Sequence, residues 1–290
     1  MVERRSPKTA RHRRLMAELN RLRAASGMSR AQVAERLGTT DTTIWRYETG
    51  LTQPKPADVG ALLEIYGVAR AAREDLIQLA KDARKRGWWH RHREILKPGF
   101  DSYIGLESEA SVVRTYQVQM IPGLLQTERY ARAIIEATAM AFAPPEIDQK
   151  VAVRMARQEL ITRAEDPMQV VAVLDEAVVR RQVGGAVVMR EQLRRLVEVG
   201  TLPNVEIRIV PFDAGAHAAM DGSFYLLEFP EPDDPDLVYL EQAGSGLIPE
   251  DAEELRRYTL MFGNLMARAL SASKSAAFLM SIAQEPDGSL

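Results

Sequence analysis

The sequence predicts a mixed fold, in which an all-α N-terminal domain of five helices precedes an α/β C-terminal domain with a small sheet of about four strands. Three observations support this. Apolar residues recur at helical spacing in the first part of the chain, and residues 205–212 alternate strictly, as a half-buried strand does. The charge also changes sign: residues 1–97 carry 21 basic and 11 acidic residues, whereas residues 98–290 carry 17 and 29.

Composition limits the class of protein. The 290 residues suffice for two domains, and 46% hydrophobic with 27% charged residues is ordinary for a globular protein. The chain has no apolar run of about 18 residues and no signal-peptide pattern, so we expect a cytoplasmic protein that does not enter a membrane. The absence of cysteine excludes disulfides and thiol nucleophiles. The bias toward arginine, 31 against 7 lysines, suggests a GC-rich bacterial genome.

The N-terminal domain is predicted at residues 13–70, after a flexible basic tail at residues 1–12. The tail contains Pro, Ser and several basic residues with no apolar period. The first helix is expected at residues 13–25, because three leucines share one face and Gly27 lies just beyond the end. These leucines are Leu15, Leu19 and Leu22.

Two short helices joined by a turn come next. Ser29 is a suitable N-cap for the first, and Gly38 follows its last apolar residue, where a left-handed conformation is favoured. Thr40 caps the second helix, in which Ile44 and Tyr47 point inward. The pair is typical of the helix-turn-helix unit, whose second helix enters the major groove of DNA. An ordinary helical hairpin is the alternative.

The outer face of the second helix carries the candidate DNA contacts. The predicted readers of base edges are Asp41, Thr42, Trp45 and Arg46. Arginine can donate two hydrogen bonds to guanine, and aspartate can accept one from cytosine N4. The predicted phosphate contacts, which combine a guanidinium with hydroxyls and helix N-terminal N–H groups, are Arg30, Thr40 and Thr43. The tail at residues 1–12 could alternatively be an arm that contacts DNA.

A fourth helix is expected after Pro56 and a fifth at residues 73–85. Residues 71–97 then connect the two domains, and they include the segment KRGWWHRHRE at residues 85–94. Basic and aromatic residues together can bind a nucleic-acid strand. The favoured interpretation is instead a hinge whose indole rings dock on the second domain. The histidines of this segment have no partner ligand in the sequence, so no metal site is expected.

Residues 15–68 resemble the phage-repressor-like (Xre-type) helix-turn-helix domain. The matching segments, in the five-helix order of that family, are RLRAASGMS, QVAERLGTT, IWRYETG, QPKP and LLEIYGV. The resemblance implies a DNA-binding regulator. Two positions depart from the family. Arg30 stands where Gln commonly contacts phosphate and braces the recognition helix, which puts the bracing role in doubt, and Trp45 occupies a position that is often small or polar.

Residues 98–285 are predicted to form the α/β domain, with residues 286–290 as a tail. Strands or extended segments are indicated by β-branched and aromatic residues or by alternation of apolar and polar residues. They are expected near residues 111–121, 168–179, 205–212, 223–229 and 237–241. Helices are expected near residues 122–135, 147–164, 189–200 and 249–270, with a last short one at 275–283.

This second part resembles an uncharacterised domain that follows Xre-type modules in a large group of actinobacterial regulators, some of them described as antitoxin-like. The segments that carry the resemblance include GFDSYIGLESEA, IPGLLQTERYARA, RQELITR, VLDEAVVRRQVGG, VMREQLRRLVE, PFDAGAHAAMDGSFYLLEF and DDPDLVYLE. The resemblance implies a transcription factor, often paired with a small partner protein encoded nearby. It brings no catalytic residues.

No motif for catalysis or for a cofactor is found, such as a Walker loop, GxGxxG, GxSxG or HExxH. Asp175 and Glu176 are adjacent, so in a strand they would face opposite sides. Glu107 and Glu109 could share a face, although exposed acidic surface is the favoured interpretation. His217 lies in a loop of small residues that could admit a ligand, but it is expected to face solvent. We therefore expect neither an enzyme nor a bound cofactor or metal.

The expected function is that of a cytoplasmic, sequence-specific transcriptional regulator whose partner is double-stranded DNA. Residues 98–285 are expected to serve regulation and homodimerisation, because this class usually binds DNA as a two-fold dimer. Two alternatives remain open. One is an antitoxin-like module that binds a small partner protein and regulates its own expression, and the other is a sensor of a small molecule.

Overall fold

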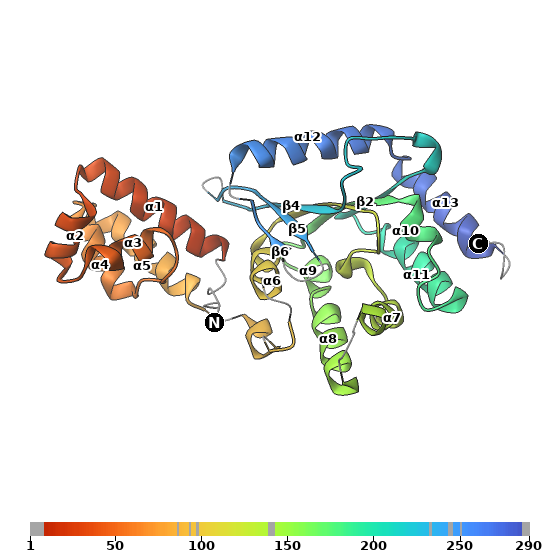
Figure 1. Ribbon diagram of the computed structural model, residues 1–290, viewed down its shortest axis with the longest axis horizontal. Helices are drawn as coiled ribbons and strands as arrows, with labels where there is room; N and C mark the ends of the chain where they lie inside the picture. Colours follow the sequence, from red (N-terminus) through yellow and green to blue (C-terminus); the bar gives the residue numbers. More distant parts are fainter. Residues whose placement is uncertain are drawn as a thin grey trace. The chain divides into compact units, whose positions relative to one another are not determined.

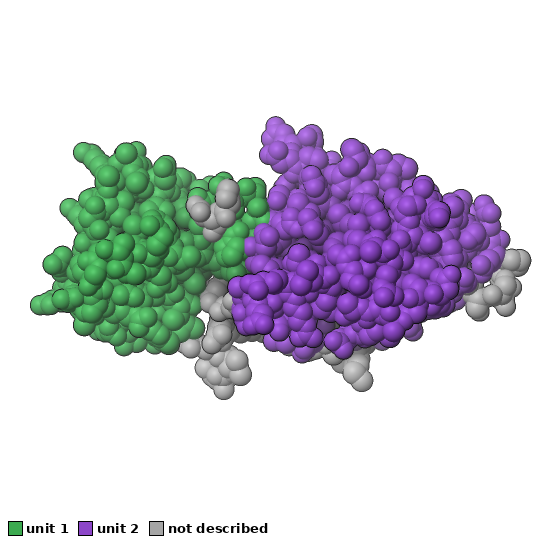
Figure 2. All heavy atoms as spheres, turned by 90° about the horizontal axis from the view of Figure 1, so that it is seen from above, with its two compact units in different colours: residues 1–90, 101–109, 229–235 green, residues 91–100, 110–228, 236–290 purple. Residues whose placement is uncertain are grey.

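The chain forms two compact units, which the computed structural model shows as a helical unit and a mixed α/β unit (Figures 1 and 2). This confirms the predicted fold class. The residues described are 9–85, 87–92, 94–96, 99–138, 143–231, 234–242, 246–249 and 251–285. The first unit comprises residues 1–90, 101–109 and 229–235, and the second comprises 91–100, 110–228 and 236–290. Neither unit is contiguous in the sequence.

The N-terminal part contains the five predicted helices in order. They are α1 (Ala10–Ser26), α2 (Arg30–Leu37), α3 (Asp41–Glu48), α4 (Pro56–Ile65) and α5 (Arg70–Ala83). A 3-10 turn η1 (Trp88–His92) and helix α6 (Phe100–Glu109) follow. Helix α1 begins before the predicted residue 13, because the Thr9 hydroxyl accepts from the backbone N–H of His12 and caps it. The last residues of the predicted tail are therefore helical, and residues 1–8 lie outside the described part.

The core of the first unit is built from the inward faces of α1 to α5. Its buried members are Leu15, Leu19, Val33, Ala34, Ile44, Val59, Leu62, Leu63 and Ala80. Burying each leucine, isoleucine or valine side chain contributes about 1.5–3 kcal/mol. A polar contact supplements this packing, since the Tyr47 hydroxyl of α3 donates to the Asp58 carboxylate of α4 over 2.9 Å.

The second unit contains a six-stranded mixed sheet in the order β3-β2-β1-β4-β5-β6. The strands are β1 (Val112–Gln117), β2 (Gln169–Asp175), β3 (Val205–Val210), β4 (Phe224–Glu228), β5 (Leu237–Glu241) and β6 (Gly246–Leu247). Strands β1, β2 and β3 are parallel, and β4, β5 and β6 add on in antiparallel fashion. The predicted count of about four strands was too low. The last strand has two residues, too few to produce a recognisable alternation.

Helices cover both faces of this sheet (Figure 1). Helix α12 (Ala252–Arg268) packs on one face, where Phe262 and Leu265 meet Phe224 and Leu226 of β4. On the other side lie α7 (Glu128–Thr138), α8 (Pro144–Ala156) and α9 (Glu159–Thr162), which connect β1 to β2. The remaining elements are η2 (Gly123–Leu125), α10 (Glu176–Arg180), α11 (Ala186–Val199), η3 (Phe212–Ala214) and α13 (Ala272–Gln284).

Strand register places a polar row on the face turned away from α12. Thr115 of β1 pairs with Tyr225 of β4, which pairs with Tyr239 of β5. Because successive side chains alternate, these three point opposite to Tyr116 and Phe224, which belong to the apolar cluster under α12. All three are buried, and they lie among apolar side chains of the same face, such as Leu227 and Leu237.

The Tyr47 contact makes the stability of the first unit depend on pH. Burial, followed by the hydrogen bond to Asp58, raises the pKa of Tyr47 from its usual value near 10 to about 12. Folding therefore favours the neutral phenol. The stability that Tyr47 contributes is complete below pH 10 and is lost as the pH rises toward 12. We expect wild type to lose more stability than Tyr47→Phe between pH 9 and pH 11, measured by urea unfolding with circular dichroism. Other tyrosines titrate alike in both proteins, and equal losses would contradict the expectation.

Candidate nucleic-acid interface

Local capping defines the two helices of the predicted helix-turn-helix. The Ser29 hydroxyl accepts from the N–H of Gln32, and the Gln32 side chain accepts from the N–H of Ser29, which forms a complete capping box. The helix ends at Gly38, whose φ of 71° lies in the left-handed region that favours glycine. Both predicted boundaries of α2 are confirmed.

Helix α3 begins at the predicted cap and turns the predicted residues inward. The Thr40 hydroxyl accepts from the N–H of Thr43, and the two hydroxyl oxygens lie 2.9 Å apart. Ile44 is 1% exposed and packs in the core, while Tyr47 is half-buried and bound to Asp58. The orientation of α3 is therefore fixed by one apolar side chain and one hydrogen bond on its inner face.

The predicted base-edge readers share the outer face of α3. Those with exposed side chains are Asp41, Thr42, Trp45 and Arg46. Trp45 keeps 40% of its surface exposed, which is unusual for an indole in a small helical unit. Two of the predicted phosphate contacts, Thr40 and Thr43, lie at the N-terminal end of the same helix, and Arg30 lies at the start of α2. The structure thus brings these residues together, and their contact with DNA stays a prediction.

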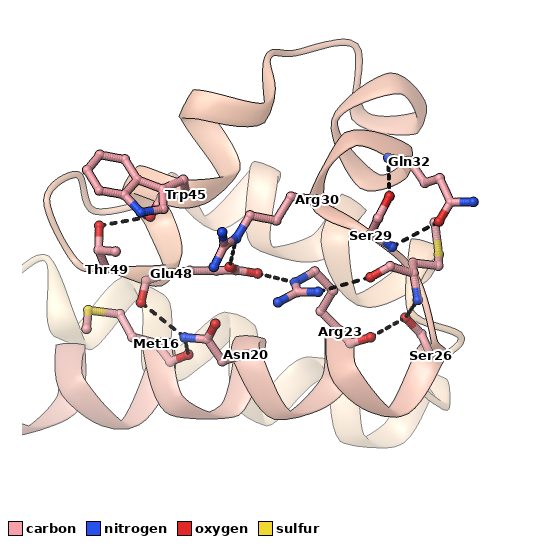
Figure 3. A network of polar contacts seen from close by, with 11 residues as sticks. Met16, Asn20, Arg23, Ser26, Ser29, Arg30, Gln32, Trp45, Glu48 and Thr49 are labelled. Atoms are coloured by element: carbon pink, nitrogen blue, oxygen red, sulfur yellow. Dashed lines mark hydrogen bonds and ion pairs between the residues drawn. The ribbon is translucent and has the colours of Figure 1, made fainter.

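A buried carboxylate holds α3 from behind (Figure 3). Glu48, the last residue of α3, is 7% exposed and forms ion pairs with Arg23 of α1 and Arg30 of α2. The Nε–Oε2 distance to Arg30 is 2.5 Å. The backbone oxygen of Glu48 accepts a further hydrogen bond, of 3.0 Å, from the Asn20 side chain. Three segments of the chain therefore meet at one residue.

Arg30 takes part in this network and holds the end of α3 through Glu48. Its Nε is bound to Glu48, and that hydrogen bond raises the pKa of Arg30. Arg30 thus braces α3, the role that had been in doubt for an arginine at this position, whereas its contact with phosphate stays a prediction. Its side chain remains 41% exposed. Glu48 also affects Tyr66, whose pKa rises to about 12 through burial and then through this nearby negative charge.

Sequence reasoning missed Glu48. A carboxylate near the C-terminal end of a helix is unfavourable for the helix dipole, so its position there indicates a specific partner. Glu48 is also four residues after Ile44 and therefore on the inward face. Both signals can be recognised in the sequence. They do not identify the partners, because Arg23 and Arg30 lie 25 and 18 residues away from Glu48.

The segment that connects the predicted domains contains a buried side chain. Trp89 of η1 is 7% exposed, and a Cβ built on Gly105 of α6 would lie 3.2 Å from its Cζ2 atom. Trp89 and Gly105 both belong to the first unit, so this contact lies within that unit and does not show an indole docked on the second one. Arg11, predicted to lie in the tail, belongs to α1, and its backbone N–H donates to Glu109 over 3.1 Å.

The acidic pairs considered in the sequence have structural partners. Glu107 is fully buried and accepts from the Tyr103 hydroxyl over 2.7 Å, so the expectation of exposed acidic surface was wrong for it. Asp175 ends β2 and caps α10 by accepting from the N–H of Ala177. Glu176 accepts from the N–H of Phe212 over 2.7 Å.

His217 is half-buried rather than facing solvent. Its Nε2 lies 3.0 Å from the Tyr116 hydroxyl, and its Nδ1 accepts from the N–H of Ala219. Within the described part of the chain, no group of three or more metal-ligating side chains gathers. The same residues include no helix that combines the length and apolar character needed to cross a membrane.

Loss of the Glu48 charge should weaken the first unit. Removing one member of a buried ion pair leaves its partner uncompensated, which typically costs about 3–5 kcal/mol. Arg23 and Arg30 retain some solvent contact. We therefore expect Glu48→Gln to lower the free energy of unfolding by about 3 kcal/mol, the lower end of this range. Urea unfolding followed at the helical signal measures the change.

Glu35→Gln is the matched control, since Glu35 is exposed on α2. It should change the free energy of unfolding by less than about 0.5 kcal/mol. Equal effects of the two substitutions would show that Glu48 is not an anchor.

Comparison with protein families finds two matches. Residues 14–76 match a helix-turn-helix domain, and residues 100–281 match a domain of unknown function, DUF5753. The first match includes α2, α3 and α4 in full and most of α1, and it supports a DNA-binding regulator. Comparisons with curated proteins and with solved structures give no match. Since the second match spans more than half of the chain, the protein belongs to the family of proteins with the DUF5753 domain, here preceded by a helix-turn-helix domain.

Proposed function

We propose that the protein is a sequence-specific transcriptional regulator of the Xre class, which reads double-stranded DNA with α3. One observation carries the proposal. Helix α3 presents four exposed side chains on its outer face, while Ile44, Tyr47 and Glu48 fix its inner face. A helix held in this way can enter a major groove with its side chains already in place, which lowers the entropic cost of binding.

The chemistry of the outer face suits base recognition. Arg46 offers two parallel N–H donors, which match the O6 and N7 acceptors of guanine. Asp41 offers acceptors for the N4 amino group of cytosine, and Thr42 can donate or accept. The exposed indole of Trp45 offers apolar surface to a thymine methyl group.

The phosphate contacts follow from the remaining donors. Thr40 and Thr43 share one hydrogen bond between their hydroxyls, so one of their two hydroxyl protons stays available to a phosphate oxygen. Arg30 donates to Glu48 through Nε, which fixes the guanidinium group. Its two terminal nitrogens can then donate to a phosphate oxygen of the DNA backbone. The backbone N–H groups at the start of α3 add the positive end of the helix dipole.

We assign dimerisation and regulation to the DUF5753 part. Helix α3 has eight residues, and one such helix buries too little surface for tight specific binding. Doubling the contact through two-fold symmetry solves this problem. Co-purification with an unrelated small protein would instead favour an antitoxin-like module with autoregulatory DNA binding.

Arg46→Ala tests base recognition. Loss of a bidentate contact should cost about 1–3 kcal/mol at the cognate site and relax the preference at one base pair per half-site. The cognate site is first obtained by selection from random DNA, and affinities are then measured at fixed salt. Stability should hardly change, because Arg46 is exposed.

Arg36→Ala, an exposed arginine on α2, is the control and should leave the preference among sequences intact. If Arg46→Ala lowers the affinity for cognate and random DNA by the same factor, Arg46 holds only phosphate and the assignment is wrong.

The dimer makes a separate prediction. The selected sites should be palindromic, with half-sites about one helical turn (10–10.5 base pairs) apart or at a multiple of this spacing. The full-length protein should sediment as a dimer at micromolar concentration. A monomer in sedimentation together with a non-palindromic site would rule out two-fold recognition.

A further inference from the structure

The outer face of α12 carries the most exposed large apolar side chain among the described residues. Leu260 is 70% exposed, although it lies in the middle of a helix of 17 residues. The stretch from Tyr258 to Ala267 contains no charged residue, whereas the solvent-facing side of a surface helix normally carries charged and polar side chains. The exposed positions of this stretch are Thr259, Leu260, Gly263, Asn264 and Ala267.

The loop after β3 runs along one side of α12. At the C-terminal end of the helix, Nη1 of Arg268 donates to the backbone oxygens of Ala214 and Ala216, over 3.2 and 3.0 Å. Nearer to its N-terminal end, Arg257 lies 3.9 Å from the carboxylate of Asp221. The loop therefore follows the helix in the opposite direction and widens the surface beside its outer face.

This loop, residues 212–222, also exposes apolar side chains. Met220, which precedes Asp221, is 67% exposed, and Phe212 is 60% exposed. Leu260, Met220 and Phe212 have larger exposed fractions than the other large apolar side chains in the described part of the chain. Single exposed apolar residues are ordinary, but several on one helix and its flanking loop are typical of a contact surface.

The ends of this surface carry opposite charges. Glu253 in the first turn of α12 is exposed and forms no ion pair with any described residue. Arg268 in the last turn is also exposed, and its acceptors are backbone oxygens rather than a carboxylate. Both charges suit the helix dipole, which accounts for their positions along the helix but not for the uncharged stretch between them.

Two antiparallel copies of α12 match each other when Leu260 lies at the two-fold axis. Glu253 precedes Leu260 by seven residues and Arg268 follows it by eight, so each Glu253 meets Arg268 of the second copy. Arg256 precedes Leu260 by four residues and Gly263 follows it by three, so the Arg256 side chain can lie across Gly263 of the second copy. A Cβ built on Gly263 would have no neighbour within 4 Å, which leaves the space open. A two-fold axis forms each of these contacts twice.

We propose that the outer face of α12, together with the loop of residues 212–222, is the surface through which two copies of this chain dimerise. The inference rests on the dimer of the proposed function and names the surface that forms it. Residues 98–290 carry 17 basic and 29 acidic residues, so two copies of this part repel each other over most of their surface. An uncharged stretch whose ends are complementary under one rotation suits a second copy.

Sedimentation of the full-length protein without DNA tests this surface. Leu260→Glu places two carboxylates beside the two-fold axis, and it should raise the Kd of the dimer about 30-fold or more. Folding should hardly change, because the side chain is mostly in solvent. Val187→Glu on α11 is the matched control, since Val187 is 59% exposed and lies outside the proposed surface. It should leave the Kd unchanged.

Exchange of the terminal charges tests the antiparallel pairing. Glu253→Arg and Arg268→Glu each place like charges opposite each other at both ends, so each variant alone should dimerise about tenfold more weakly at low salt. An equal mixture of the two variants should restore the wild-type Kd within about threefold, because opposite charges then meet again across the interface. A contact with any other protein would not make one variant rescue the other.

Three results would overturn the inference, and they differ in what else they affect. A dimer that Leu260→Glu leaves intact forms through another surface, and the proposed function stands. Failure of the mixture to recover, with each variant alone weakened, rejects the antiparallel pairing. A wild-type protein that sediments as a monomer rejects the dimer itself, whereas base recognition by α3 is still decided by Arg46→Ala.

Discussion

The helical unit depends on one buried carboxylate. Helix α3 has eight residues, and helices of that length are not stable on their own in water. Its geometry must come from its neighbours, and Glu48 ties its end to α1 through Arg23 and to α2 through Arg30. These contacts are directional, unlike the packing of Ile44. They set the rotation of the helix about its axis, and thereby decide which side chains face outward.

The second unit solves a different problem, because its sheet encloses polar side chains together with apolar ones. The face under α12 is lined by apolar side chains such as Phe224 and Leu226. The opposite face carries Thr115, Tyr225 and Tyr239 in register among apolar side chains such as Leu227 and Leu237, and further polar contacts lie between η2 and the end of α8. Buried polar groups require partners, so the helices on that side are positioned by hydrogen bonds as well as by area. Such a face specifies its neighbours more narrowly than an apolar one.

Local signals predicted much of this structure. Ser29, Gly38 and Thr40 act within one turn of the chain, so the ends of α2 and the start of α3 could be read from residue types. The inward position of Ile44 follows from helical period alone. The position of the candidate DNA-contacting residues on one face was predicted for the same reason.

What the sequence did not reveal depends on residues distant in the chain. Glu48 meets arginines that only the tertiary fold brings near it. Glu107 has the composition of a surface residue, but the fold encloses it beside Tyr103. Strand β6 exists because Leu240 and Glu241 of β5 offer it a partner, and two residues carry no pattern of their own.

The discontinuous first unit has a consequence for synthesis on the ribosome. Its helix-turn-helix core comes early, but residues 101–109 and 229–235 also belong to it. Arg14 pairs with Glu231 over 3.4 Å, and Trp89 packs against Gly105. Chains usually fold from the N-terminus as they emerge, one domain after another. Here residues 229–235 can join the first unit only after most of the second unit has been translated. The contacts that hold α3, which come from Arg23, Arg30 and Asp58, are available from the start, so the recognition helix can be in place before its unit is complete.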